Sequence, residues 1–166
     1  LDSSRFTYYL SQALGAAPID VEGIVIGGHG DTTMVPLISK ATYKSQPVTK
    51  LLDKETADKV VADTMVGGAT ITGLLGTSAW YGPGAAAAVM TKSIILDQKK
   101  IFPCCVALEG EYGKKDICIG VPAVLGKNGV EKVVEIELNA AEKEAFDKSA
   151  AAVSKTNEVL KGMNLV

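Results

Sequence analysis

The sequence is poor in histidine, arginine and aromatic residues. Its 166 residues include a single His (His29), a single Arg (Arg5) and only 5% aromatic residues, while sixteen Lys supply the other basic side chains. The guanidinium group of Arg differs from the ammonium group of Lys because it presents a planar pair of donors that fits a carboxylate. On composition alone, two interpretations of Arg5 stay open: chance, or a position that needs this two-pronged donor.

Long apolar runs are also absent, and so is an excess of charge of one sign. No run approaches the ~20 apolar residues that span a bilayer, and the longest small-residue stretch covers only Ala85 to Met90. The formal net charge is −2, so we expect neither a nucleic acid nor a membrane as a partner. With 47% apolar and 22% charged residues, the composition is typical of one globular domain over residues 1–166.

Cysteine is scarce and unevenly placed. Cys104, Cys105 and Cys118 are an odd number, and two of them are adjacent in a strand-like segment. Buried, reduced thiols of a cytoplasmic protein explain this pattern best. We expect no metal site, because zinc would need a fourth ligand. The chain starts at Leu1 without a signal-peptide pattern, and a fragment or processed product is the expected origin of such a start.

Several motifs that carry chemistry are missing. The sequence has no G-x-S-x-G nucleophile elbow, no Walker phosphate loop and no G-x-G-x-x-G turn after a predicted strand. The chain is therefore expected to have no dinucleotide cradle of its own.

Helical periodicity predicts four helices: residues 1–14, residues 53–75, a segment through 85–88 to about 96, and residues 139–162. Asp53 is expected to cap the second helix, and Asn139 with Glu142 resembles a capping box for the fourth. Gly67-Gly68 should cost the second helix about 1 kcal/mol per Gly relative to Ala. Either that helix bends there, or another backbone comes close.

Strand patterns are predicted for residues 21–26, 101–108, 117–125 and 134–138. Asn128-Gly129 fits a type I′ hairpin turn between the last two. Val134, Ile136 and Leu138 alternate with Glu, which gives the final strand one solvent-exposed face. Together the segments predict the α+β class, with a mainly antiparallel sheet packed with long helices.

His29 is the first candidate for chemistry. It follows an apolar strand and lies between Gly28 and Gly30, with Gly27 before them. Three glycines clear a loop of side chains, so that a ligand can approach the ring closely. The imidazole also changes its charge near neutral pH, which suits acid–base catalysis. The alternative is a tight turn that carries a hydrated surface His, and we favour the chemical interpretation.

Asp2 and Arg5 are three residues apart at a helix start, so their side chains project to neighbouring positions. They could form an exposed ion pair of little consequence. They could instead act together, with Arg5 binding a carboxylate and Asp2 orienting a distant His. Ser78 follows a helix-ending Gly and could be only an N-cap. Asp31 could orient His29, although capping of the next turn is the better interpretation.

Four segments, in this order, resemble the C-terminal substrate half of the lactate/malate dehydrogenase family: Leu1-Asp2-Ser3-Ser4-Arg5-Phe6, Gly27-Gly28-His29-Gly30-Asp31, Gly67-Gly68-Ala69 and the run from Gly120 to Gly129. The ordered set is highly specific and extends over essentially the whole chain. Residues 75–81 and 108–113 look closer to lactate-dehydrogenase-like malate dehydrogenases than to true lactate dehydrogenases. The resemblance implies the α+β fold of that domain.

The resemblance implies a role for each candidate residue. His29 would exchange a proton with the substrate oxygen, and Asp2 would accept a hydrogen bond from its other ring nitrogen. Arg5 would bind the substrate carboxylate bidentately, and Ser78 would line the pocket. The implied reaction is oxidation of malate by NAD to oxaloacetate and NADH, with a small 2-hydroxy or 2-oxo dicarboxylate as the substrate.

The resemblance also implies an N-terminal Rossmann domain, absent from this chain, that would bind most of the NAD. The family is generally dimeric or tetrameric, so a cytoplasmic homodimer or homotetramer is expected. The loop that separates malate from lactate belongs to the missing half, which keeps a lactate dehydrogenase half as an alternative. Two further alternatives are a non-catalytic domain that self-associates through the helix around Ala85, and a carboxylate-binding module that uses Arg5 without chemistry.

Overall fold

The computed structural model describes residues 1–163 and divides the chain into two compact units. The first unit joins Leu1–Val25 to Pro36–Lys92, and the second joins Ile26–Val35 to the residues from Ser93 onward. Within the described part of the chain, no helix combines the length and the apolar character that crossing a membrane requires.

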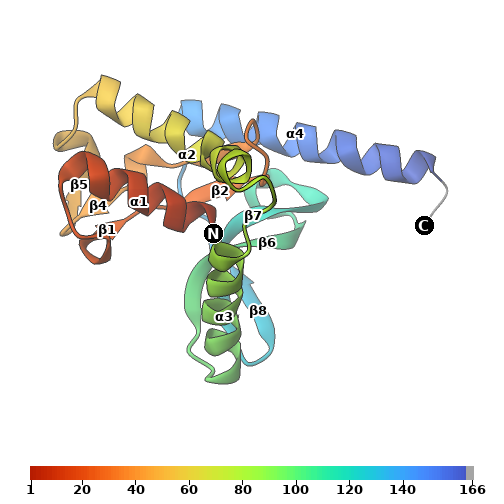
Figure 1. Cartoon of the computed structure of the whole chain (residues 1–166). Helices are drawn as coiled ribbons and strands as arrows, with labels where there is room; N and C mark the ends of the chain where they lie inside the picture. Colours follow the sequence, from red (N-terminus) through yellow and green to blue (C-terminus); the bar gives the residue numbers. More distant parts are fainter. Residues whose placement is uncertain (164–166) are drawn as a thin grey trace. The chain divides into compact units, whose positions relative to one another are not determined.

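The elements shown in Figure 1 are α1 (Asp2–Leu14), β1 (Val21–Glu22), β2 (Val25–Gly27), β3 (Met34–Pro36), β4 (Thr42–Tyr43), β5 (Gln46–Pro47), α2 (Lys54–Leu75), α3 (Tyr81–Ile95), β6 (Lys100–Glu109), β7 (Lys115–Gly126), β8 (Gly129–Val133) and α4 (Ala140–Gly162). All four predicted helices are present. The pairings β1–β4, β4–β5, β2–β7, β6–β7 and β7–β8 are all antiparallel. The α+β prediction is therefore confirmed.

Helix α1 packs along α2 in the first unit (Figure 1). Phe6 and Leu10 on the inner side of α1 are completely buried. Gly15 ends α1 in the left-handed conformation, with φ 60°. At the start of α2, the backbone N–H of Thr56 donates to Asp53 Oδ1 over 2.8 Å. Both predicted boundaries are confirmed, because each depends on a cap that is close in sequence.

The segment predicted as one strand from Val21 to Ile26 is instead two short strands in different sheets. Between them, a Cβ placed on Gly23 would lie 2.7 Å from the Phe6 ring. The backbone N–H of Val25 donates to Ser3 Oγ of α1 over 3.0 Å. The chain thus follows the surface of α1 at this point, and the contact with the helix interrupts the strand.

The hairpin between β7 and β8 is confirmed, but its predicted type I′ turn is wrong. The pair Gly126↔Gly129 leaves Lys127 and Asn128 as the central residues, and neither has a positive φ. Gly129 follows with φ 85°, which is the arrangement of a G1 bulge. Positive φ at two successive turn residues occurs instead at Lys44-Ser45, between β4 and β5.

The second unit is built on a five-stranded sheet with the order β3-β2-β7-β6, and β8 also pairs with β7. The central strand β7 turns Ile119, Val121 and Ala123 to the core. Helix α4 packs against β7 and contributes the buried Phe146 and Ala150. Strand β2 pairs with β7 through Gly27 and Gly120, so the loop that follows β2 begins beside the central strand of this sheet.

Residues 134–138 keep the predicted alternation of partly buried and exposed side chains, but they form no strand. The backbone N–H of Val134 donates to Pro122 O over 2.8 Å, and that of Ile136 donates to Tyr112 Oη over 2.9 Å. The predicted strand is wrong because single hydrogen bonds, one of them to a side chain, take the place of a ladder.

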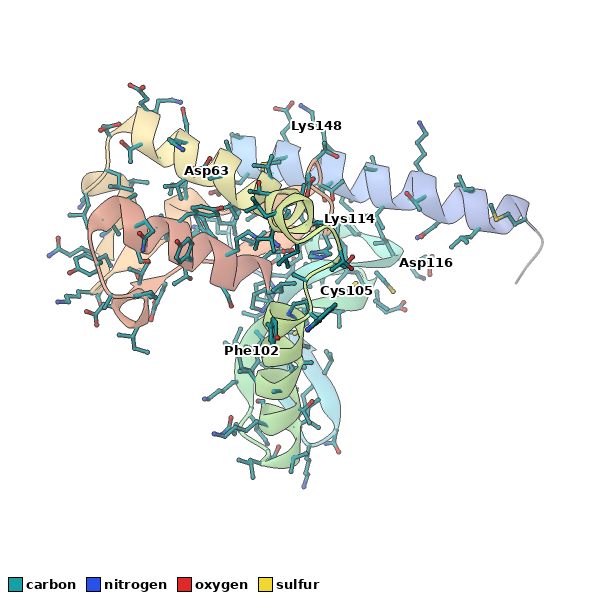
Figure 2. The ribbon with its side chains drawn as sticks, viewed as in Figure 1. Asp63, Phe102, Cys105, Lys114, Asp116 and Lys148 are labelled. Carbon is teal, nitrogen blue, oxygen red and sulfur yellow. The ribbon has the colours of Figure 1, made fainter. Side chains whose placement is uncertain are left out.

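Helix α4 begins with the predicted capping box. The backbone N–H of Glu142 donates to Asn139 Oδ1, and the backbone N–H of Asn139 donates to Glu142 Oε2, each over 3.0 Å. One turn later, Asp147 accepts from Lys114, which is labelled in Figure 2, over 2.5 Å. The start of α4 is thus held by contacts near in sequence and by one that is distant.

All three cysteines are free thiols, but the expectation that all are buried is wrong. Cys104 faces the core, whereas Cys105 (Figure 2) and Cys118 are exposed. The reason is strand alternation, because adjacent residues of β6 point to opposite faces of the sheet. Partial burial nevertheless raises the pKa of the Cys105 thiol.

Candidate functional site

His29 lies in a six-residue loop, 28–33, between β2 and β3, and its side chain is exposed. The loop is closed by hydrogen bonds between its own residues. The backbone N–H of Gly30 donates to Thr33 Oγ1 over 2.9 Å, and the backbone N–H of Thr33 donates to Gly30 O over 2.8 Å. The imidazole is therefore carried by a tied loop and is accessible from outside the chain.

The glycines around His29 are explained by the closure of this loop. A Cβ on Gly27, which has φ 92°, would lie 2.6 Å from Thr33 O, and one on Gly28 would lie 2.7 Å from Thr33 Oγ1. Gly30 is less restricted, at 3.1 Å from the same hydroxyl. The sequence suggested that the glycines make room for a ligand. The structure shows that Gly27 and Gly28 make room for Thr33, at the far end of the loop.

A buried hydroxyl of α4 also contacts the loop. Ser149 is 3% exposed. Its Oγ accepts from the backbone N–H of Gly28 over 2.8 Å and donates to Thr33 O over 2.7 Å. Ser149 was not predicted as a site residue. Its position in an amphipathic helix, 121 residues after Gly28, gives no local signal of this contact.

Asp2 and Arg5 lie together at the start of α1 in the first unit. Arg5 Nη1 is 3.6 Å from Asp2 Oδ1, and the two side chains are only 14% and 17% exposed. The same nitrogen donates to Thr64 O of α2 over 3.3 Å. The interpretation of an exposed ion pair is therefore wrong, because both charged groups are largely withdrawn from water.

The Gly67-Gly68 pair of α2 receives the Arg5 side chain. A Cβ on Gly67 would lie 2.8 Å from Arg5 Cδ, and one on Gly68 would lie 3.1 Å from Arg5 Nη2. The expectation that α2 bends here or meets another backbone is replaced by a more specific finding. The two glycines make space for the one arginine of the chain.

Ser78 is exposed in the segment between α2 and α3. It is not the N-cap of α3, since that helix begins at Tyr81 and the backbone N–H of Gly84 donates to Trp80 O over 2.8 Å. Asp31 is exposed in the turn before β3. The structure thus brings Asp2 and Arg5 together in the first unit and places His29 in the second, while the role of each remains a prediction.

A cavity of about 340 Å³ lies in the second unit, away from these candidates in sequence, and its lining includes Tyr112, Ile136 and Phe146. The Tyr112 hydroxyl is used by the fold, because it donates to Val134 O over 3.1 Å and accepts from the backbone N–H of Ile136. The cavity contains no predicted site residue, so its size does not make it the candidate site.

The family is shown by comparison with known proteins. Residues 1–163 match the model of the lactate/malate dehydrogenase, alpha/beta C-terminal domain, so the chain belongs to this family of dehydrogenase domains. A malate dehydrogenase from Parabacteroides distasonis is 68% identical over 97% of the chain. The chain spans about half the length of the curated relatives that it matches, 51% in this case.

Solved structures agree with this assignment. The malate dehydrogenase from Salinibacter ruber superposes with a TM-score of 0.94 at 43% identity, over 98% of this chain and 53% of that one. A lactate dehydrogenase from Eimeria maxima, solved with NADH and oxamate, gives a TM-score of 0.94 at 33% identity, over 98% of this chain and 51% of that one. The fold is thus shared by malate and lactate dehydrogenases, and relatives of high identity carry the name malate dehydrogenase.

Proposed function

We propose that this chain is the substrate-binding and acid–base half of an NAD-dependent malate dehydrogenase. The observations that carry the proposal are the separate settings of its lone imidazole and its lone guanidinium. His29 is exposed on a loop tied by hydrogen bonds, and Arg5 lies in a space that two helix glycines leave open. The names of the relatives favour malate over lactate as the substrate.

Each candidate residue has a chemical task in this proposal. Arg5 binds the carboxylate beside the reacting carbon, and its planar donors fix the direction of the substrate. His29 accepts the hydroxyl proton as the hydride leaves that carbon, so that no full charge develops on the oxygen. Asp2 stabilises the imidazolium that forms, as the carboxylate does in other oriented acid–base pairs. Ser78 lines the pocket for the small dicarboxylate.

NAD supplies the hydride acceptor when it is bound, and an N-terminal nucleotide domain outside this chain would hold most of it. Two features of the described residues fit this division. The sequence has no dinucleotide cradle, and the exposed position of His29 at a loop leaves the ring open to a substrate and a cofactor presented by another domain.

The exposed apolar side chains of helix α3 support a partner that covers this helix. Its segment Gly82-Pro83-Gly84-Ala85-Ala86-Ala87-Ala88 is uncharged, and Tyr81, Val89 and Ile95 are 83%, 51% and 74% exposed. A helix that is apolar on most of its circumference is normally covered. Leu1 lies against the first turn of α3, since a Cβ on Gly82 would be 3.1 Å from Leu1 Cδ1.

The alternatives stay distinguishable from the leading proposal. A lactate dehydrogenase half would give turnover with lactate in the full-length protein. A second copy of the chain could cover α3, as expected for a homodimer, a homotetramer or a non-catalytic self-association domain. A cytoplasmic location follows from the proposal as an expectation.

The main test uses the full-length protein that contains this chain. His29→Asn should abolish NAD-dependent oxidation of malate and leave NADH binding nearly unchanged, because the ring acts on the substrate and not on the nucleotide. Steady-state kinetics and NADH fluorescence titration measure the two effects. Turnover that stays within a few-fold of the unmodified protein would show that His29 is not the proton relay.

Calorimetry separates the enzyme from a simple carboxylate-binding module. Malate and oxalate are titrated into the 166-residue chain alone, and then into the chain with the nucleotide domain added. Binding that requires the added domain supports the dehydrogenase, and so does the absence of malate turnover in the isolated chain. Tight binding to the isolated chain would favour the module.

A further inference from the structure

Ser149 occupies an unusual position for a helical serine. It lies on the buried side of α4, between the core residues Phe146 and Ala150, and is 3% exposed. A serine inside a helix commonly bonds to the carbonyl one turn earlier. Here the hydroxyl bonds outward to the loop of residues 28–33. A buried polar group at a position that the core would fill with an apolar side chain requires a specific reason.

The hydroxyl uses both of its hydrogen-bonding functions on this loop. Ser149 Oγ accepts the N–H of Gly28 and donates its proton to the carbonyl of Thr33, at 2.8 Å and 2.7 Å. Gly28 precedes His29, and Thr33 ends the loop. One atom of α4 therefore connects the backbone directly before the imidazole, at Gly28, to the backbone at the end of the loop, at Thr33.

The backbone of the loop lies close to this atom and to its neighbour on α4. A Cβ on Gly27 would lie 2.8 Å from Ser149 Oγ, and a Cβ on Gly28 would lie 3.2 Å from Val153 Cγ2, one turn further along α4. The loop therefore packs closely against α4 at Gly27 and Gly28. Loss of the hydroxyl would leave one backbone donor and one backbone acceptor without their partner, which favours movement of the loop away from α4.

We propose that Ser149 is a positioning residue for the proton-transfer step, which it controls by holding the His29 loop at a fixed distance from α4. This inference rests on the proposed function. Ser149 touches neither the substrate nor the cofactor in this account. Its effect is on the geometry of the ring, and errors of about 1 Å in a reacting group can reduce turnover roughly 100-fold.

The first arm of the test needs no enzymatic activity. His29 is the only histidine, so the imidazole resonances in an NMR spectrum of the 166-residue chain belong to one residue. Ser149→Ala should shift or broaden these resonances and accelerate amide hydrogen exchange at Gly28 about tenfold or more, as the lost hydrogen bond predicts. Unchanged ring resonances and unchanged exchange at Gly28 would overturn the proposal.

Ser93→Ala is the matched control. Ser93 is also a completely buried serine of the second unit, and its Oγ donates to Leu125 O over 2.8 Å, outside the His29 loop. The Ser93→Ala variant should lose about as much stability as Ser149→Ala and leave the His29 resonances in place. An equal effect of both variants on His29 would show that Ser149 acts only through general stability.

The second arm uses the full-length protein with malate and NAD. Ser149→Ala should lower kcat roughly 10- to 100-fold with little change in KM, because Arg5 still binds the substrate carboxylate. Ser149→Thr, which keeps the hydroxyl, should restore most of kcat. A rise in KM with kcat unchanged, or a failure of Thr to exceed Ala in a folded protein, would contradict positioning. If His29→Asn leaves turnover intact, the proposed function fails while the NMR result still stands.

Discussion

The two units hold their candidate residues by different physical means. In the first unit, the Arg5 side chain fills the space over Gly67-Gly68 and is 14% exposed, and its Nη1 also donates to Thr64 O. In the second unit, His29 is exposed on a loop held by directed hydrogen bonds, in which the backbone N–H groups of Gly30 and Gly28 donate to the hydroxyl oxygens of Thr33 and Ser149. The guanidinium site should therefore be sensitive to added volume, and the imidazole site to loss of single hydroxyl groups.

The largest expected effects come from the core of each unit. Phe6→Ala in the first and Phe146→Ala in the second each remove a side chain that is at most 1% exposed. Each should cost about 3–5 kcal/mol of unfolding free energy. Hydrogen exchange by mass spectrometry, read separately over α1 and over β7, measures where protection is lost. Equal loss of protection in both units for either variant would contradict the division of the chain into two compact units.

A smaller effect tests the space around Arg5. Two glycines of α2 differ in their surroundings: a Cβ on Gly67 meets Arg5 Cδ at 2.8 Å, whereas nothing lies within 4 Å of one on Gly73. Gly73→Ala should stabilise the protein by about 0.5–1 kcal/mol, as helix propensity predicts. Gly67→Ala should give no such gain, or a loss, in chemical denaturation. A matching gain at both positions would mean that Arg5 does not need this space.

The smallest effect is a pH dependence at the start of α2. Hydrogen bonds from Thr56, first from its backbone N–H, lower the pKa of Asp53 from its usual value of 3.8. A lowered folded-state pKa means that the stabilisation is complete above about pH 4 and is lost as the pH falls through the folded pKa. Asp53→Asn keeps the cap without the titration. The free energy of unfolding of this variant should change less between pH 5 and pH 2 than that of the unmodified protein. An equal acid dependence of the two proteins would contradict a stabilising titration of Asp53.

The elements that could be predicted from the sequence are those set by nearby residues. Asp53, the pair Asn139–Glu142 and Gly15 all act within one turn of a helix end, so the pattern contains both partners. Residues 134–138 failed as a strand because alternation reports exposure and does not report a pairing partner. The position of a strand in a sheet depends on residues far away in the sequence, which periodicity does not contain.

The same limit applies to the candidate site. The rarity of His29 and Arg5 in the composition identified them without any coordinates. The reason for Gly67-Gly68 required knowledge that Arg5, 62 residues earlier, packs onto α2. The contact of Ser149 with Gly28 spans 121 residues, and no local pattern distinguishes this serine from Ser154, the other serine of α4.

The distribution of thiols offers a practical handle. All three cysteines belong to the second unit, and of these Cys104 alone is buried, beside the exposed Cys105 on the same strand. With Cys105 and Cys118 replaced by serine, a thiol reagent would reach its one remaining target only when β6 opens. The rate of Cys104 labelling would then report how often the unit that carries His29 opens, with no probe attached to the His29 loop itself.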